Sequence, residues 1–191
     1  IRSIVRQSGD DYDDIDEYAA HLSGRLDALA RTQVLLTRAA GATVDLESLI
    51  RDELSAQIAD YDRFEIDGPE VALSPRAAEV LGLALHELGT NSIKYGALAE
   101  TRGRIDIRWS VAPIGDESWL QLVWQEYCEL ETTQPIRRGF GTELIEERVP
   151  YELAGEASLD LTSQGVRAEI AFPLVDGTSV LETGPDRRID S

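Results

Sequence analysis

The sequence predicts an α+β protein in which an N-terminal helical hairpin precedes an α/β sandwich. Three observations carry this prediction: helical apolar periodicity in the first 40 residues, a long apolar helix near 74–96, and pairs of alternating segments after it. A chain of 191 residues exceeds the roughly 100–150 residues of a typical domain, so two unequal modules fit. We predict domains at 1–40 and 41–175 and a disordered tail at 176–191.

Composition narrows the function classes. The chain carries 36 acidic and 18 basic residues, a net charge of −18, so its surface should repel polyanions and nucleic-acid binding is not expected. The single cysteine, Cys128, excludes an internal disulfide and fits a reducing, cytoplasmic setting. No apolar run approaches the roughly 20 residues that span a bilayer. We therefore expect a cytoplasmic module without membrane contact.

The first 40 residues predict two helices joined by a short turn. Ile1, Ile4 and Val5 form a helical stripe with no preceding cap, and the chain has no methionine to start it, so we expect that an N-terminal part has been removed. After Ser8-Gly9, apolar residues recur at intervals of three and four from Ile15 to Ala30. This pattern favours an antiparallel hairpin.

The second module is expected to begin near Gly41, which interrupts the helical pattern. Asp45 is placed to cap a helix over Leu46–Ile58, and Phe64–Asp67 alternates like a strand before the Gly68-Pro69 turn.

Ser74-Pro75 is a strong helix start, because proline favours the first helical position. The helix runs toward Gly96, which we expect to end it in a left-handed conformation. The remaining elements are predicted as strands at 104–111 and 119–124, a helix opened by Gly139-Phe140-Gly141 and running to about Val149, and a second hairpin of strands at 156–162 and 166–173.

The most informative stretch is HELGTNSIKYGAL at residues 86–98. At roughly 100° per residue, Glu87, Asn91 and Lys94 fall within about 60° of each other on one face of an apolar helix. An amide oxygen can ligate Mg²⁺, a carboxylate can accept a proton, and an ammonium can neutralise a phosphate oxygen. By itself such a face is more typical of solvated salt bridges than of a site.

The order of the later motifs changes that balance. The helix is followed by two strands, a carboxylate at the end of the second in Trp124-Gln125-Glu126, and then GFGT at 139–142. A buried carboxylate can accept the adenine amino proton, and glycines let the backbone approach phosphates at a helix N-terminus. A lone GxG would indicate only a turn, but together these parts predict a pocket for a metal nucleotide.

These residues resemble the HWE histidine kinases, a bacterial branch of the two-component sensor kinases with a GHKL-type ATPase domain. His86 and Trp124-Gln125-Glu126 stand at the two elements that name the family. HELGTNSIKYGAL is similar to its N-box, GFGTELIEERV to its second glycine box, and HLSGRLDALARTQVLLT to the second helix of its dimerisation hairpin. The resemblance covers roughly residues 1–174.

The resemblance implies a Bergerat-type sandwich that binds ATP and Mg²⁺ and phosphorylates a histidine on a dimerising hairpin. By position, Asn91 would ligate Mg²⁺, Glu87 would assist catalysis and Lys94 would contact phosphate. Glu126 would hold the adenine amino group. The remaining cofactor-binding positions implied are Tyr95, Gly139, Phe140, Gly141 and Thr142. His86 is open between a catalytic and a structural role.

The implied partners are a response regulator, whose receiver-domain aspartate takes the phosphoryl group, and a second copy of the chain. A sensor domain would lie N-terminal to residue 1, as would the acceptor histidine. His21 matches the start of the second hairpin helix and is not the expected acceptor, and Gln33 stands where relatives often carry histidine.

One departure motivates an alternative function. Relatives usually carry paired glycines after Trp-x-Glu, whereas this chain has Tyr127-Cys128-Glu129-Leu130, which adds bulk and negative charge beside the expected nucleotide site. The alternative is a degenerate module that holds nucleotide or docks a response regulator without kinase activity. A third possibility, another ATPase of this superfamily such as a topoisomerase, needs larger transducing domains and fits the hairpin poorly.

Overall fold

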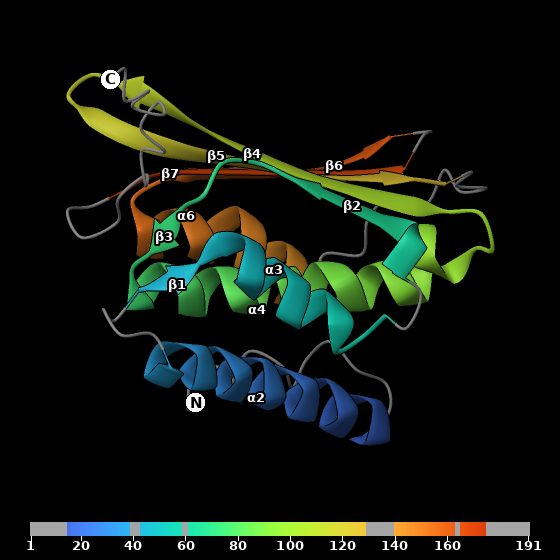
Figure 1. The fold of residues 1–191 in the computed structure, drawn as a ribbon. Helices are drawn as coiled ribbons and strands as arrows, with labels where there is room; N and C mark the ends of the chain where they lie inside the picture. The colour runs from blue at the N-terminus through green and yellow to red at the C-terminus, as the bar shows by residue number, and fades with distance from the viewer. Residues whose placement is uncertain (1–14, 39–42, 59–60, 129–139, 163–164, 175–191) are drawn as a thin grey trace, which may run out of the picture.

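A five-stranded sheet, with helices packed against one of its faces, forms the centre of the computed structural model (Figure 1). The structure describes residues 15–38, 43–58, 61–128, 140–162 and 165–174. The helices are α2 (Ile15–Arg38), α3 (Leu46–Ser55), α4 (Pro75–Tyr95), α5 (Phe140–Glu143) and α6 (Val149–Leu153), with 3₁₀ turns η1 (Tyr61–Arg63) and η2 (Ala97–Ala99) and a π-helical turn η3 (Leu144–Arg148). The strands are β1 (Val44–Asp45), β2 (Phe64–Asp67), β3 (Ala72–Leu73), β4 (Arg104–Ile114), β5 (Glu117–Tyr127), β6 (Glu156–Thr162) and β7 (Gly165–Pro173).

The sheet has the order β2-β4-β5-β7-β6, and only the β2–β4 pair is parallel. Both predicted hairpins are confirmed, although β4 and β5 extend beyond the predicted strands to a two-residue turn at Gly115-Asp116. Gly115 adopts φ 63°, a left-handed conformation that favours glycine. β1 and β3 form a separate antiparallel pair that the sequence did not indicate.

Side-chain caps start two helices where the sequence predicts them. The Asp45 side chain accepts a 2.8 Å hydrogen bond from the Ser48 backbone N–H at the start of α3, and the Ser74 hydroxyl accepts one of 3.2 Å from Ala77 N–H at the start of α4. α3 ends at Ser55, three residues before the predicted end.

The core lies between the sheet and the helices α3, α4 and α6. Alternate residues of β4 and β5 point inward, and the apolar positions of α4 pack onto them, as the predicted periodicities require. Among the described residues, the largest side chain that is fully buried is that of Trp124 in the Trp-x-Glu motif. Within the described residues, no helix is both long enough and apolar enough to cross a bilayer.

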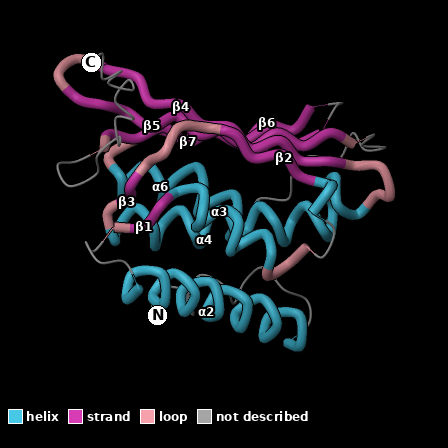
Figure 2. Tube along the Cα trace, viewed as in Figure 1, coloured by secondary structure: helices cyan, strands magenta, loops and turns pink. Residues whose placement is uncertain are grey.

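Helix α2 packs against α4 on the side away from the sheet (Figures 1 and 2). Two glycines permit the close approach: a Cβ added to Gly82 of α4 would lie 2.6 Å from Thr32 Oγ1, and one added to Gly24 of α2 would lie 2.8 Å from His86 Nε2. The predicted first hairpin helix at residues 1–8 and the tail at 176–191 lie outside the described residues, and the predicted domain boundaries stay predictions.

Two further helix ends differ from the prediction. Gly96 has φ −114°, so the left-handed cap expected there is wrong. A Cβ at Gly96 would lie 2.1 Å from Glu126 Oε2, so close approach of β5, rather than positive φ, requires this glycine. The helix that begins at Phe140 continues past Val149 to Leu153, where Ala154 caps it at φ 51°. Its π turn, in which Val149 N–H donates to Leu144 C=O, lies just before Pro150, which has no N–H to continue a regular α-helix.

Candidate nucleotide site

The polar face predicted on the long helix lies on α4, which is unbroken from Pro75 to Tyr95. Along this face, exposure rises toward the C-terminal end: Glu87 is 3% exposed, Asn91 is half-buried and Lys94 is exposed. Tyr95, also predicted to contact the cofactor, is 70% exposed at the helix end. The site therefore has a buried carboxylate at one end and accessible groups at the other.

The second glycine motif meets this face directly. A Cβ built on Gly141 would lie 3.0 Å from Asn91 Nδ2 and 3.4 Å from Glu87 Oε2. The absence of a side chain at Gly141 thus lets the backbone of the second glycine motif lie close to the amide and the carboxylate, and a phosphate-binding loop also needs a backbone that ligands can approach closely. Phe140 begins α5, Thr142 lies half-buried in its first turn, and Gly139 lies outside the described residues.

The donor set fits Mg²⁺ chemistry. Mg²⁺ takes few protein ligands, usually oxygens, and draws the others from water and substrate phosphates. The Asn91 side chain carries one such oxygen on the amide whose Nδ2 lies beside Gly141, and Glu87 adds a carboxylate one helical turn earlier. The described residues hold no cluster of three or more His, Cys, Asp or Glu that would form a protein-only metal cage.

Glu126 is 1% exposed, and its carboxylate accepts hydrogen bonds from other groups of the protein. Its Oε2 accepts a 2.7 Å hydrogen bond from Ala97 N–H, and its Oε1 accepts one of 3.0 Å from Trp124 Nε1. Burial raises the pKa of the Glu126 carboxyl, while the hydrogen bonds from Ala97, Trp124 and Ser92 act in the opposite direction. The motif carboxylate therefore ties β5 to the turn after α4, and its adenine contact stays a prediction.

Arg63 holds the segment that follows this turn. Its Nη2 donates to the carbonyl oxygens of Ala97 at 2.9 Å, of Gly103 at 2.8 Å and of Glu100, and its Nε donates to Gly103 at 3.1 Å. The chain from 97 to 103 is thus fixed by one guanidinium from η1. Sequence reasoning gave Arg63 no role, because its partners are backbone groups 34 to 40 residues away.

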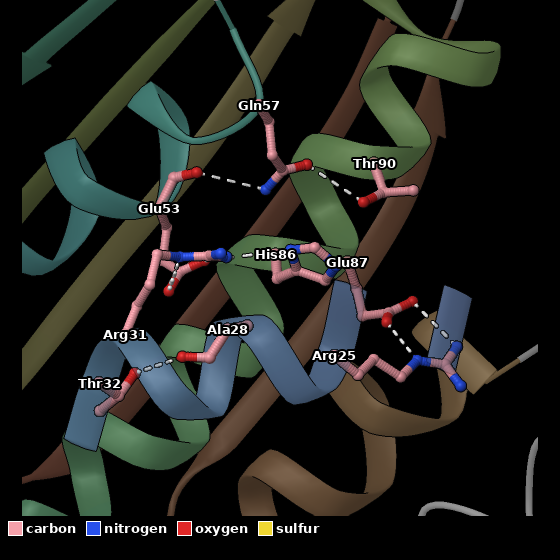
Figure 3. A network of polar contacts seen from close by, with 9 residues as sticks. All are labelled: Arg25, Ala28, Arg31, Thr32, Glu53, Gln57, His86, Glu87 and Thr90. Atoms are coloured by element: carbon pink, nitrogen blue, oxygen red, sulfur yellow. Dashed lines mark hydrogen bonds and ion pairs between the residues drawn. The ribbon is translucent and has the colours of Figure 1, made fainter. Parts of the chain in front are cut away.

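His86 lies on a different side of α4 from Asn91. Figure 3 shows it among the residues that join α2, α3 and α4, with its Nδ1 4.0 Å from Glu53 Oε2. That nitrogen is buried without a hydrogen-bond partner. Burial lowers the pKa of His86 to about 4, assisted by the charges of Arg31 and Arg25, so the ring is neutral near pH 7. Of the two roles that the sequence leaves open for His86, these contacts support the structural one. A catalytic role stays a prediction.

Two ion pairs join α2 to α4 and to α3 (Figure 3). Arg25 Nε donates to Glu87 Oε1 at 2.6 Å, with both side chains almost fully buried, and Arg25 Nη2 lies 3.4 Å from Glu87 Oε2. Arg31 donates to both oxygens of Glu53 on α3 at 2.6 and 3.2 Å. Sequence reasoning missed both pairs, although Arg25 stands inside the segment that resembles the dimerisation hairpin.

Lys94 also contacts α2. Its Nζ donates to His21 Nε2 at 2.5 Å.

A groove of about 490 Å³ lies between α2 and α3. It is lined by Asp27, Ala30, Arg31, Val34, Leu35 and Asp52, none of which belongs to the predicted nucleotide motifs.

The family model of the HWE histidine kinases matches residues 1–70. Among curated proteins, the chain is 33% identical over 173 residues to a blue-light-activated histidine kinase of Rhizobium johnstonii, covering 91% of this chain and 48% of the relative. It is also 33% identical over 168 residues to blue-light-activated histidine kinase 1 of Erythrobacter litoralis, covering 84% and 45%. The chain thus spans about half the length of the curated relatives it matches.

Among solved structures, the histidine kinase domain of an Erythrobacter litoralis blue-light-activated histidine kinase superposes with a TM-score of 0.61. The superposition covers 81% of this chain and 75% of that domain, at 19% sequence identity. At this sequence identity the similarity concerns the fold alone. The mixed sheet with helices on one face is the architecture that the two structures share.

Proposed function

This chain belongs to the HWE histidine kinase family, and from this premise we propose that residues 41–175 form the catalytic, ATP-binding module of a sensor histidine kinase. The module transfers the γ-phosphoryl group of ATP to a histidine of a dimerisation hairpin. A response-regulator receiver domain then takes the group on an aspartate. We also expect the module to act in the cytoplasm as part of a homodimer.

The observation that carries this proposal is the position of Gly141 beside Asn91 and Glu87. Two motifs separated by 50 residues in the chain meet where one supplies a metal-ligating amide and the other an open backbone. A phosphate chain needs both features, a cation that neutralises its charge and a backbone without a side chain in the way. A solvated salt-bridge helix would need neither.

In the proposed site, Asn91 holds Mg²⁺, Lys94 contacts a phosphate oxygen, and Gly139, Phe140, Gly141 and Thr142 line the phosphates. The bound Mg²⁺ would neutralise charge on the phosphates during transfer. Glu87 accepts the proton released by the acceptor histidine, which requires hydrogen-bond contact with that histidine.

Glu126 and Tyr95 are proposed to recognise the adenosine part. A carboxylate offers about four lone-pair sites, and three of those on Glu126 accept from Ala97, Trp124 and Ser92, so one is left for an adenine amino donor. Exposed Tyr95 lies one residue after Lys94, at the end of the same helix.

The second candidate function is a degenerate nucleotide-binding or response-regulator-docking module. It is favoured by the side chains that replace glycines after Glu126. Tyr127 is 37% exposed with the Arg104 guanidinium 4.6 Å from its ring centroid, and Cys128 is half-buried. Glu129 and Leu130, the other two residues of this segment, lie outside the described residues.

Calorimetric titration of ATP with and without Mg²⁺ tests the pocket, and phosphoryl transfer to a histidine-bearing hairpin supplied in trans tests the reaction. Mg²⁺-dependent binding together with transfer supports the kinase. Binding without transfer favours the degenerate module. Comparison of ATP with inorganic triphosphate in Glu126→Ala isolates the base contact, because only ATP should lose affinity through that residue.

A further inference from the structure

The predicted nucleotide face of α4 is in contact with α2 in this structure. Two of its three polar residues have partners on that helix: Glu87 is paired with Arg25, and Lys94 is bonded to His21. The Arg25 and Glu87 side chains are 1% and 4% exposed, so little room remains for another group at the carboxylate. A general base must reach the proton it accepts, and Glu87 cannot do so while Arg25 covers it.

We infer that α2 and the metal nucleotide compete for this face of α4, so that the docked helix holds the module in a resting state. The inference rests on the proposed function, because it needs a nucleotide that uses Lys94 and an acceptor that uses Glu87. The nucleotide would bind only the form in which α2 is released, and α2 would dock only on the form without nucleotide. Nucleotide binding should therefore release α2, and release of α2 should strengthen nucleotide binding by the same factor.

The chemistry of the contact supports competition. Arginine binds carboxylates and phosphates through the same planar donors, so its guanidinium can exchange Glu87 for a phosphate oxygen or for water. The Lys94 ammonium likewise can contact either His21 or a phosphate oxygen, because both would occupy the same place beside it. The Arg25–Glu87 pair is buried, but both contacts lie between α2 and α4 on the side of α4 away from the sheet, so both can open without unfolding the sheet.

A steric feature away from the nucleotide face offers a clean way to release α2. Gly82 lies five residues before Glu87, and a Cβ there would be 2.6 Å from Thr32 Oγ1, whose position is fixed by a 3.2 Å hydrogen bond to Ala28 C=O. Alanine also favours the helical conformation of α4 over glycine. Gly82→Ala should therefore displace α2 without altering Glu87, Asn91 or Lys94.

The experiment measures ATP affinity by calorimetry with Mg²⁺, and amide hydrogen exchange of residues 15–38 with and without nucleotide. Competition predicts that Gly82→Ala and Arg25→Met each raise ATP affinity by about fivefold or more and speed α2 exchange. The double variant Gly82→Ala/Thr32→Ala removes the clash. It should return both the ATP affinity and the α2 exchange rate to those of the original chain. Arg51→Met is the matched control, because Arg51 pairs with Glu47 on the exposed face of α3 and should change neither.

Two results would overturn the inference. If the protein binds ATP but nucleotide leaves α2 exchange unchanged and Gly82→Ala has the affinity of the original chain, competition is wrong and the proposed function stands. If no variant binds ATP even though α2 exchange shows its release in Gly82→Ala, both fail. Loss of ATP binding in Arg25→Met with normal binding in Gly82→Ala would instead assign Arg25 a supporting role in the site and would also contradict competition.

Discussion

The Glu126 carboxylate accepts a 2.7 Å hydrogen bond from the Ala97 backbone N–H, which joins β5 to the turn after α4. Because the same carboxylate also accepts from Trp124 Nε1 at 3.0 Å and from the Ser92 side chain, it has three buried donors to satisfy. Its place in the fold therefore constrains any test of its role in nucleotide binding.

Glu126→Gln should lower the free energy of unfolding by about 1–3 kcal/mol, because the amide oxygen can still accept but the amide NH2 group turns a donor toward at least one of these buried donors. Urea unfolding at pH 7 measures the change. Glu117→Gln, at the exposed start of the same strand, is the control and should stay within about 0.5 kcal/mol of the original chain. Equal stability of both variants would show that the hydrogen bonds accepted by Glu126 contribute little to folding.

Asn91→Ala should abolish the Mg²⁺ dependence of ATP binding, because a methyl group cannot ligate the ion. The residue is half-buried on the polar face, so the substitution leaves the core intact. Calorimetric titration with and without Mg²⁺ gives the two affinities, and Ser110→Ala, which changes an exposed side chain of β4, serves as control. An undiminished Mg²⁺ effect would assign the metal to other ligands.

His86 should make the protein less stable as the pH falls. Its pKa is lowered from 6.5 to about 4 in the folded chain, so between these values the unfolded chain binds more protons. Its contribution to stability is therefore complete above about pH 6.5 and is lost toward pH 4, a loss of about 3 kcal/mol.

The measurement is the difference in unfolding free energy between the original chain and His86→Gln at several pH values from 7.5 to 4. The difference cancels the carboxyl groups that both chains share, including Glu53, whose pKa is raised by burial. The original chain should lose stability faster than the variant. Parallel pH profiles would contradict the prediction.

Arg63→Lys should destabilise the protein by about 2–3 kcal/mol, because an ammonium cannot reproduce the guanidinium contacts with the carbonyls of Ala97, Glu100 and Gly103. Thermal or urea unfolding measures this loss. Arg51→Lys, which alters only an exposed ion pair with Glu47, is the control. A loss below about 0.5 kcal/mol would show that the segment 97–103 is held by other contacts.

The Cys128 thiol should react slowly with alkylating reagents. Burial, with the charges of Glu126 and Glu100, raises its pKa to about 11 from 9.0, so at pH 8 the thiolate fraction falls by about a hundredfold. Iodoacetamide labelling followed by mass spectrometry gives the rate, and the same chain in urea is the reference. Similar rates in the folded and unfolded chain would contradict the raised pKa.

Local patterns predicted most of the secondary structure. Asp45 and Ser74 cap the helices they precede, and the alternating segments form two antiparallel hairpins, because capping and period-2 burial depend on neighbouring residues. Gly96 shows the limit of such reasoning. A glycine after a helix usually indicates positive φ, but here Glu126, 30 residues away, decides why a side chain is not tolerated.

The sequence by itself determined the family, the order of the motifs and the face of α4 that carries Glu87, Asn91 and Lys94, because helical periodicity and motif spacing are local properties. Only the tertiary structure decided what meets that face: Gly141 beside Asn91, and Arg25 of α2 on Glu87. The physical reason is that a buried ion pair between residues 62 positions apart depends on how two helices pack, and no pattern within either helix encodes its partner.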